Sequence, residues 1–346
     1  MTTRFAMPDE VARWNSIISE NPDGGNVMQG REFAEQKRAT GWTPVYLRLD
    51  GVALTVLQKT VLPLGRYWYV PKGPGVEDAA SLAALLPELK AFAAGRGVFG
   101  IKIDPELPSD PEVAEALEAA GLVRTTNVQP NVSTVVLDIS GDLESIEASF
   151  GSKTRYNIRA ARKAGVETRV VEVDDENCRI FYRLLDETAE GSFSIRSEEY
   201  YTSFWQRHAR AQAGAFLFAY VEGEVVSADF IMMLGAKASR KDAASTRKRT
   251  VRGASALLEV AAIEWLKIRG VTEYDLCGAP PSSEAKNKDH EHYGIGMFKT
   301  GFNSTITDFV GTFDLPVKAL QHRAWTRIGE RATLKVHRMR HHESWY

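Results

Sequence analysis

The sequence has few cysteines and no long apolar run. Its two cysteines, Cys178 and Cys277, are too few and too far apart for a disulfide framework or a cysteine-ligated metal centre. No run of about 18 apolar residues occurs, so we expect no membrane-spanning helix. The start of the sequence lacks the apolar segment of a signal peptide, and we therefore expect a cytoplasmic, reduced protein.

The sequence also has no large excess of positive or negative charge and none of the common catalytic motifs. Lysine and arginine number 43 against 45 acids, a net charge of -2, so any nucleic-acid contact needs a local basic patch. GxSxG, CxxC, HExxH and Walker lysine motifs are absent. Histidines group at His290 and His292, and again at His337, His341 and His342, without carboxylate or cysteine partners at ligand spacing. We therefore expect neither a metal nor a cofactor.

Segments with strand and helix patterns alternate along the chain, and the same layout occurs twice. In the first half we expect strands at 44–49, 51–57, 66–70 and 99–103 and helices at 81–94 and 111–120. In the second half we expect helices at 152–164, 177–190, 198–213 and 255–269 and strands at 167–173, 215–221, 225–233 and 273–276. This predicts an α/β protein of two similar units at 1–145 and 146–316, followed by a cationic helical segment at 317–346.

Two segments concentrate positive charge. In 152–166, Arg155, Arg159 and Arg162 fall on one ridge of a helix at about 100° per residue. Like charges at this spacing repel each other, and a bound phosphate would reduce that electrostatic repulsion. A salt-bridged or solvent-facing helix is the plainer alternative. For the cationic segment from 318 onward, a solvated helix face is likewise the plainer interpretation and nucleic-acid contact the alternative.

The stretch 293–315 carries a single lysine, Lys299, directly after Phe298. Glycines on both sides of it predict a tight bend that holds the ammonium group beside a ligand, in surroundings dried by apolar neighbours. An ordinary turn lysine on a β-hairpin is the alternative. Asp104, which ends a strand before a proline, is a candidate general base, although a surface-like aspartate is a weak one and a turn aspartate is the alternative.

A further basic cluster precedes the helix expected at 255–269. It comprises Arg240, Lys241, Arg247, Lys248, Arg249 and Arg252. A helix N-terminus beside arginines resembles the pyrophosphate site of acetyl-coenzyme A-dependent N-acyltransferases, whose pattern is R/Q-x-x-G-x-G/A. Here Arg252 stands where that pattern has its first glycine, so the backbone cannot approach a phosphate in the usual way. This predicts an acyltransferase-like unit that has lost coenzyme A.

An ordered set of short motifs carries a family resemblance. The motifs are Gln29…Phe33…Lys37…Gly41-Trp42, Ile103-Asp104-Pro105-Glu106, Lys153-Thr154-Arg155-Tyr156-Asn157-Ile158-Arg159, Lys163-Ala164-Gly165-Val166, Ile195-Arg196, Tyr200-Tyr201, Tyr274-Asp275-Leu276-Cys277-Gly278 and Phe298-Lys299-Thr300-Gly301-Phe302. Together they resemble the FemABX family, from about residue 29 to residue 315. Members are non-ribosomal peptidyltransferases with two acetyltransferase-like (GNAT-like) units. Some carry a coiled-coil arm, but no heptad run interrupts 200–252, so we expect the armless type.

The resemblance implies roles for individual residues. It implies that Lys299 lies near the reacting ester and Asp104 near the acceptor amine, as the catalytic pair. The substrate-binding residues that follow from it are Lys37, Arg196, Tyr200, Tyr201 and Phe298, with Lys37 and Arg196 on the precursor's phosphates. Candidate tRNA contacts are Arg155, Arg159, Arg162, Arg323 and Arg327. Asp242 stands where the family often has a tyrosine, before Ala243-Ala244-Ser245.

The predicted activity is transfer of an amino acid from aminoacyl-tRNA to the stem-peptide amine of a peptidoglycan precursor. The acceptor is UDP-MurNAc-pentapeptide or a lipid-linked precursor, and we expect a monomer with peripheral membrane association. An acyl-coenzyme A-dependent N-acyltransferase is the alternative. A carbohydrate- or phosphate-binding module is a third, non-enzymatic one.

Overall fold

The chain forms two compact units. The computed structural model describes residues 3–129, 132–189, 195–247, 251–341 and 344–346. Unit 1 comprises Met1–Pro130 and Phe309–Tyr346, and unit 2 comprises Asn131–Asp308. These bounds differ from the expected 1–145, 146–316 and 317–346, because β8 (Val136–Asp138) pairs within the second sheet and β15 (Phe313–Pro316) returns to the first.

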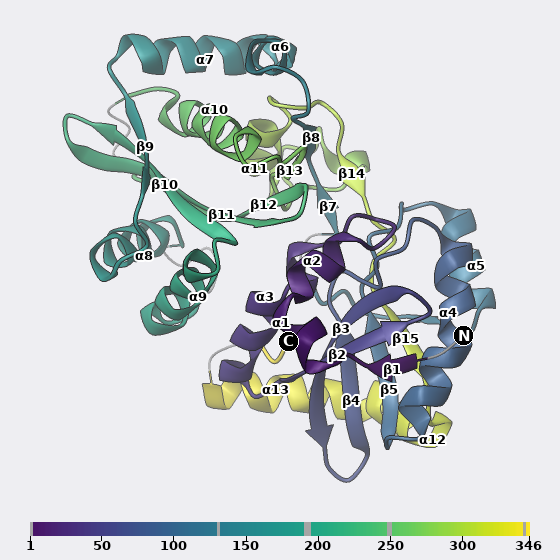
Figure 1. Cartoon of the computed structure of the whole chain (residues 1–346). Helices are drawn as coiled ribbons and strands as arrows, with labels where there is room; N and C mark the ends of the chain where they lie inside the picture. The colour runs from purple at the N-terminus through teal and green to yellow at the C-terminus, as the bar shows by residue number, and fades with distance from the viewer. Residues whose placement is uncertain (1–2, 130–131, 190–194, 248–250, 342–343) are drawn as a thin grey trace. The chain divides into compact units, whose positions relative to one another are not determined.

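Unit 1 is built on a seven-stranded sheet of order β1-β2-β3-β4-β5-β15-β6 (Figure 1). The remaining strands are β1 (Thr3–Phe5), β2 (Thr43–Leu49), β3 (Val52–Val61), β4 (Gly65–Val70), β5 (Val98–Ile103) and β6 (Val123–Arg124). Of the neighbouring pairs, β4 and β5 run parallel, because α4 (Ala79–Ala94) crosses between them. The β2–β3 hairpin turns at Asp50 and Gly51, with φ of 49° and 89°, as the Asp-Gly pair predicts.

The two faces of this sheet bury different side chains. Under α4, Leu54, Val56 and Ile101 pack with the helix residues Leu82 and Leu86 in an aliphatic core. Because side chains alternate along a strand, the opposite face carries aromatic residues, which contact the C-terminal helices. The sheet contributes Tyr67, Tyr69 and Phe99, and the C-terminal segment contributes Trp325, Trp345 and Tyr346. The C-terminal helical elements are α12 (Ala319–Ala324), η4 (Trp325–Gly329) and α13 (Glu330–His341).

Unit 2 contains a six-stranded sheet of order β8-β13-β12-β11-β10-β9. Its strands are β9 (Glu167–Val171), β10 (Gly214–Val221), β11 (Glu224–Leu234), β12 (Lys237–Ser245) and β13 (Glu273–Asp275), and a separate short pair is β7 (Ser133–Thr134) with β14 (Thr307–Asp308). β12 and β13 run parallel, joined by α10 (Ala254–Lys267). The strand β12 was not expected, because it includes the polar residues Arg240, Lys241 and Asp242.

Helices cover both faces of the second sheet (Figure 1). Leu217 and Ile231 point to the side of α10, and on that side α7 (Ser152–Lys163) packs against α10. Phe216 and Phe230 point to the opposite side, where α8 (Asp175–Ala189) and α9 (Glu198–Arg210) supply aromatic partners. The helix expected at 152–164 corresponds to α7, and a separate helix, α6 (Leu143–Ser149), precedes it.

Both units follow an antiparallel meander with a parallel strand–helix–strand crossover. The mixed α/β class and the two acetyltransferase-like units are therefore as predicted. Among the described residues of unit 2, no helix exceeds the 15 residues of α8, which leaves no coiled-coil arm there. Within the described ranges, none of the helices is both long and apolar enough to cross a bilayer. The other helices are α1 (Pro8–Ala12), α2 (Trp14–Ser19), η1 (Val27–Gln29), α3 (Arg31–Gln36), η2 (Lys37–Thr40), α5 (Pro111–Ala119), η3 (Ser282–Glu284) and α11 (Tyr293–Lys299).

Candidate functional site

Lys299 is the last residue of α11 in unit 2, and its side chain is 7% exposed. The tight bend predicted around it is wrong, because Gly294 and Gly296 lie inside a helix rather than in a turn. Gly296 allows that helix to pack closely, since a Cβ there would lie 2.6 Å from Pro280. The ammonium group is therefore held by a helix end against the segment that follows β13.

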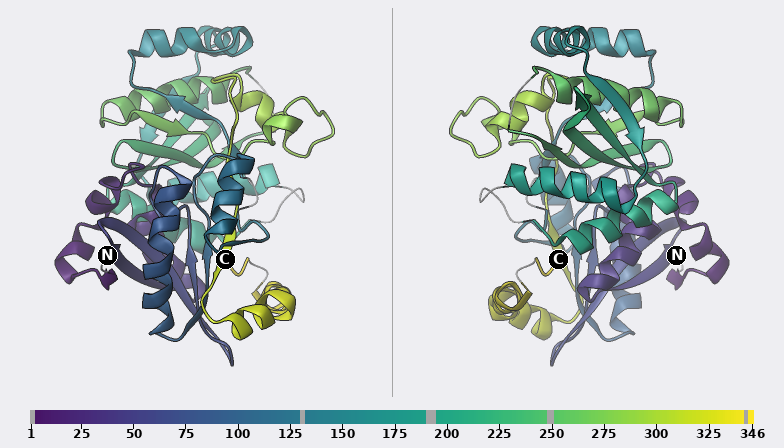
Figure 2. Two further views of the ribbon diagram at one scale, coloured as in Figure 1. Left: turned by 90° about the vertical axis from the view of Figure 1, so that its right-hand side faces the viewer. Right: turned by 90° about the vertical axis from the view of Figure 1, so that its left-hand side faces the viewer.

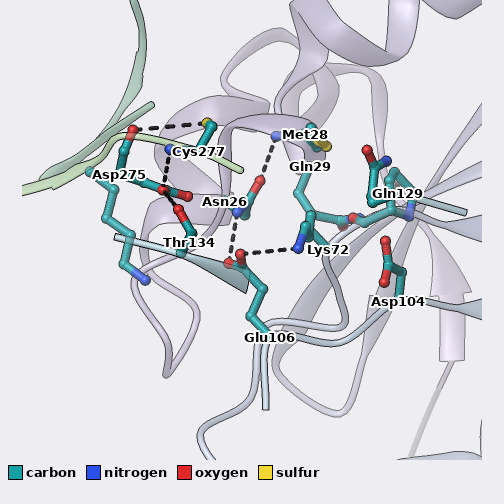
Figure 3. Close-up of polar contacts among 12 residues, drawn as sticks. Asn26, Met28, Gln29, Lys72, Asp104, Glu106, Gln129, Thr134, Asp275 and Cys277 are labelled. Carbon is teal, nitrogen blue, oxygen red and sulfur yellow. Dashed lines mark hydrogen bonds and ion pairs between the residues drawn. The ribbon is translucent and has the colours of Figure 1, made fainter. Parts of the chain in front are cut away.

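Two backbone carbonyls fix the ammonium group. Lys299 Nζ donates hydrogen bonds to the carbonyl oxygens of Cys277 and Gly278, the latter at 2.7 Å. Both residues have positive φ, 56° and 28°, which turns their carbonyls toward the lysine. Asp275 holds this turn, because its Oδ1 accepts hydrogen bonds from the Cys277 amide at 2.7 Å and from the Thr134 hydroxyl (Figure 3). A left-handed non-glycine residue such as Cys277 costs about 1–3 kcal/mol, and such residues cluster at functional sites.

A buried charged network supports the end of α11. We call Asp229, Arg240, Glu259 and Tyr274 the Arg240 quartet. The Arg240 guanidinium lies 2.6 Å from a carboxylate oxygen of Asp229 and 2.6 Å from one of Glu259. Tyr274 donates a hydrogen bond to Glu259 at 3.0 Å. The guanidinium carbon of Arg240 lies 5.4 Å from the ring centre of Phe298, so the quartet packs directly beneath the residue that precedes Lys299.

Burial changes the proton affinities of these groups. It lowers the pKa of Lys299 to about 8, and the positive charge of Arg240 acts in the same direction. Burial raises the pKa of Glu259 to about 7, with Arg240 opposing and Asp229 reinforcing the change. Lys299 is therefore mostly charged at neutral pH and can donate a hydrogen bond to an oxyanion from a nearly dry position.

Asp104 directly follows β5 in unit 1 and is buried, at 2% exposure. The expectation of a surface-like aspartate is wrong. Its carboxylate accepts hydrogen bonds from Thr312 at 3.3 Å and Tyr69 at 3.4 Å. Burial raises the pKa of Asp104 above its usual value, while the charge of Lys72 opposes this shift. A buried carboxylate with a raised pKa is a stronger base than the sequence suggested.

The polar residues around Asp104 were not predicted from the sequence. Lys72 follows β4 with a positive φ of 48°, and its Nζ lies 3.7 Å from Glu106 Oε1 and 4.8 Å from the ring centre of Phe309. Asn26 donates to Glu106 at 2.7 Å (Figure 3). Since β4 and β5 are parallel neighbours, Lys72, Asp104 and Glu106 all follow the carboxyl ends of adjacent strands, where α/β sheets bind ligands. A polar residue soon after each strand is the sequence feature that could have identified this site. It is informative only if β4 and β5 are known to be parallel neighbours.

The functional groups of the two candidate catalytic residues lie at corresponding strand ends of their units, although Lys299 itself belongs to a helix. Asp104 follows β5, the second strand of the parallel crossover of unit 1. The Cys277–Gly278 carbonyls that hold Lys299 follow β13, the second strand of the crossover of unit 2. Asp104 thus lies at the end of the second crossover strand of unit 1, and the ammonium group of Lys299, from α11, is bound at the end of the second crossover strand of unit 2.

The predicted substrate-binding residues form two groups in different units. Lys37 begins η2 in unit 1 and is half-buried, with Nζ 5.1 Å from the ring centre of Phe33. Arg196 lies 4.5 Å over the ring of Tyr200 in unit 2, and Tyr200 packs edge-on against Tyr201 at 6.2 Å. Phe298 packs beside Lys299 as described. Arg196, Tyr200 and Tyr201 therefore come together at the start of α9.

The cationic ridge of α7 is partly used within the protein. Arg155 donates a hydrogen bond to the carbonyl of Ala148, and Arg162 forms a two-pronged ion pair with Glu147 at 2.7 Å. Arg159 is exposed and has no ion pair within the described residues. Arg323 and Arg327 are exposed in unit 1. The salt-bridged alternative thus holds for Arg162, and Arg159 remains available to an external anion.

The degenerate phosphate loop of unit 2 is closed by another helix. Lys248 and Arg249 lie outside the described residues, but Gly253, with φ of 87°, caps α10. A Cβ on Gly253 would lie 2.2 Å from the carbonyl oxygen of Asn157, so the backbone of α7 sits against the N-terminus of α10. An acceptor oxygen occupies the approach that a pyrophosphate would take.

No metal centre is visible in the part of the chain that the structure describes. Within those residues no three His, Cys, Asp or Glu side chains are grouped to hold an ion. The rings of His290 and His292 lie 5.6 Å apart. Of the second predicted histidine group, His342 lies outside the described residues.

Comparisons with known proteins place this fold in a family. The sequence profile of the FemAB family matches residues 117–251 and 225–328, together more than half of the chain. The chain belongs to the FemAB family. A curated relative, "Lipid II:glycine glycyltransferase" of Staphylococcus aureus (strain MRSA252), is 22% identical over 388 residues, covering 87% of this chain and 90% of the relative. The resemblance to FemABX proteins is thereby confirmed.

Solved structures share the fold. A crystal structure of FemX matches with a TM-score of 0.81 and 18% identity, covering 94% of this chain and 100% of FemX. The C-terminal domain of a putative lysylphosphatidylglycerol synthetase from Agrobacterium fabrum matches with a TM-score of 0.55 and 15% identity, covering 92% of this chain and 96% of that one. Because the two sequence identities are only 18% and 15%, these matches establish the fold of this chain but not its substrates.

Proposed function

We propose that this protein is an aminoacyltransferase that moves an amino acid from aminoacyl-tRNA to the stem-peptide amine of a peptidoglycan precursor. The observation that carries the proposal is the buried ammonium of Lys299, which donates to two carbonyls and retains a third N–H. Membership of the FemAB family supports it, as does the glycyl transfer onto Lipid II named for the relative. The charged tRNA donor implies a cytoplasmic location.

The chemistry needs no covalent intermediate on the protein. The ester of an aminoacyl-tRNA is already activated, so the acceptor amine attacks its carbonyl carbon, a C–N bond forms and the C–O bond to the ribose breaks. One proton leaves the acceptor nitrogen and one is gained by the ribose oxygen. Asp104 is the proposed base for the amine, and the third N–H of Lys299 stabilises the oxyanion or the departing ribose oxygen.

The phosphates of the precursor are the proposed ligands of Lys37 and Arg196. Lys37→Ala and Arg196→Ala are expected to weaken precursor binding about 10- to 100-fold each, because a hydrogen bond to a charged group contributes roughly 1.5–3 kcal/mol. Titration calorimetry with UDP-MurNAc-pentapeptide measures this. Arg38→Ala is the matched control for the first variant, because Arg38 already pairs with Glu35 at 2.5 Å. Unchanged affinity in both test variants would remove these residues from the binding site.

The exposed part of α7 is the proposed contact for tRNA phosphates. Arg159→Gln is expected to reduce aminoacyl-tRNA affinity and to lower the slope of log K against log salt by about 1. Arg162→Gln is the matched control on the same helix and is expected to change the slope less, since Glu147 already neutralises Arg162. Filter binding over a salt series measures both. Equal slopes for Arg159→Gln and the natural protein would contradict the assignment.

The proposed activity is tested by offering several charged tRNAs with soluble and lipid-linked acceptors and identifying the product by mass. A precursor heavier by one amino-acid residue is the expected result. Acyl-coenzyme A with an amine acceptor is run in parallel, together with a coenzyme A binding measurement. The closed approach to the N-terminus of α10 leads us to expect no coenzyme A binding. Transfer from acyl-coenzyme A but not from tRNA would replace the proposal with the N-acyltransferase alternative.

A further inference from the structure

The C-terminal helical segment of unit 1 carries aliphatic side chains on its outer face. This segment, from α12 through η4 to α13, is drawn in yellow in Figure 2. Leu320 is 81% exposed, Ile328 74% and Met339 69%, and Val336 is also exposed. The inner face is buried in contrast, with Trp325 at 0% exposure. Four exposed aliphatic residues along one segment are more than the scattered single residues of an ordinary surface.

The same outer face is uniformly cationic. Between residues 319 and 341 the sequence has six arginine or lysine residues and one acid, Glu330. The cations, all exposed, are Arg323, Arg327, Arg331, Lys335, Arg338 and Arg340. Glu330 does not neutralise them, because it turns inward, lying 3.3 Å from the fully buried Lys102 and accepting a hydrogen bond from Tyr346. The outer face therefore presents positive charge and aliphatic groups with no acid of its own segment among them.

We propose that this outer face docks the protein on an anionic membrane surface. Cations beside exposed aliphatic groups are the pattern of helices that lie at the boundary between headgroups and acyl chains. RNA is also an anion and could pair with the arginines, but RNA contacts use cationic groups and aromatic rings, and the exposed Leu320, Ile328, Val336 and Met339 have no counterpart on RNA. The aromatic rings of this segment and its surroundings point inward instead.

The inference rests on the proposed function and narrows it. Docking places the enzyme on the surface that carries lipid-linked acceptors, in preference to the soluble nucleotide form. It also gives Arg323 and Arg327, predicted as tRNA contacts, a membrane partner. The ligand of the outer face is a layer of anionic phospholipid headgroups, with the acyl chains accessible beneath it.

Vesicle flotation with the full chain tests the inference. The probe is phosphatidylcholine vesicles with and without phosphatidylglycerol, and the natural protein is expected to bind only the anionic set. Each cation near such a surface contributes about fivefold to partitioning, so Arg331→Gln with Arg338→Gln is expected to reduce binding about 25-fold. Ile328→Ser with Met339→Ser is expected to reduce binding to the same vesicles through the aliphatic contribution.

Matched controls come from exposed residues elsewhere in unit 1. Lys90→Gln, on α4, and Leu62→Ser, at a side chain 86% exposed, are expected to leave vesicle binding unchanged. Equal binding of the natural protein to neutral and anionic vesicles, or unchanged binding in both double variants, would overturn the inference. So would a loss of tRNA affinity in the arginine variant without a loss of vesicle binding, which would assign this face to RNA.

The transfer assay separates this inference from the proposed function. In the arginine variant, transfer to an acceptor embedded in anionic vesicles is expected to fall, while transfer to a soluble acceptor stays as in the natural protein. Anionic vesicle binding without transfer to either acceptor would reject the proposed function and leave the docking face intact. Transfer to both acceptors without vesicle binding would reject the docking face and leave the proposed function intact.

Discussion

Replacing Lys299 with methionine is expected to lower the rate of aminoacyl transfer about 100-fold while leaving precursor affinity unchanged. One preorganised donor to a developing oxyanion contributes roughly 3 kcal/mol, and this contact exists only once the carbonyl becomes tetrahedral. Methionine keeps an apolar stem in a site where the natural side chain is 7% exposed. Single-turnover transfer from charged tRNA measures the chemical step apart from product release.

Lys267→Met is the matched control for this variant. Lys267 also ends a helix of unit 2, α10, and its Nζ also donates to backbone carbonyls, those of Ile139 at 2.8 Å and Gly141. It therefore reproduces the structural contacts of Lys299 without the proposed role in catalysis. A normal rate in Lys299→Met, or an equal loss of rate in both variants, would remove the ammonium of Lys299 from the chemistry.

The pH dependence gives the same residue an independent signature. Because the pKa of Lys299 is lowered to about 8, the ammonium is lost above that pH, and the rate is expected to fall on the alkaline side with an apparent pKa near 8. Arginine stays charged throughout this range, so Lys299→Arg is expected to abolish the alkaline limb even if the rate is reduced. An alkaline limb that persists unchanged in Lys299→Arg would assign it to another group.

The lowered pKa also has a consequence for stability. The ordinary pKa of the lysine side chain is 10.5, so between about pH 8 and pH 10.5 the unfolded chain binds more protons at this position than the folded one. The free energy of unfolding therefore gains a contribution from Lys299 that rises with pH across that window. Lys299→Met removes this contribution, which denaturant titrations at two pH values within the window detect.

The sequence patterns identified most of the fold and less of the site. The Asp50-Gly51 hairpin and the helices α4 and α10 follow from local turn chemistry and apolar periodicity, which act over a few residues. β12 was not predicted because its sequence is polar. Arg240 within it is nevertheless buried, because it forms ion pairs with Asp229 and Glu259. Hydrophobic periodicity cannot reveal a strand whose buried residues are charged and paired across the fold.

The surroundings of the catalytic candidates were hidden for a similar reason. Local propensity made α11 look like a bend, because Gly294 and Gly296 are poor helix formers, but packing against Pro280 overrides that preference. Lys299 itself stands out in the sequence, while its partners Cys277 and Gly278 act through backbone carbonyls that no side-chain pattern encodes. Asp104 was found, but Lys72 was not, since their relation depends on the parallel pairing of β4 and β5.

The Arg240 quartet makes a second large effect expected, this time on folding. Arg240→Met leaves Asp229 and Glu259 buried without their shared cation, and breaking a buried ion pair in this way costs about 3–5 kcal/mol of unfolding free energy. Lys241→Met, the neighbouring residue of β12, is the matched control. Its side chain is 30% exposed and pairs with Asp242 at 3.0 Å, so a loss of about 1 kcal/mol or less is expected. Urea denaturation measures both.

The pH dependence of that loss identifies its cause. The pKa of Glu259 is raised from 4.5 to about 7, so its contribution to stability is present below pH 4.5 and is lost as the pH rises through 7. Without Arg240, which opposes this shift, the pKa of Glu259 rises further and the destabilisation of Arg240→Met is expected to be larger above pH 7 than below it. Adding Glu259→Gln to Arg240→Met removes one of the two carboxylates and is expected to restore part of the stability. A loss that is independent of pH, or that Glu259→Gln does not relieve, would mean that Arg240 stabilises unit 2 by packing under Phe298 rather than by charge.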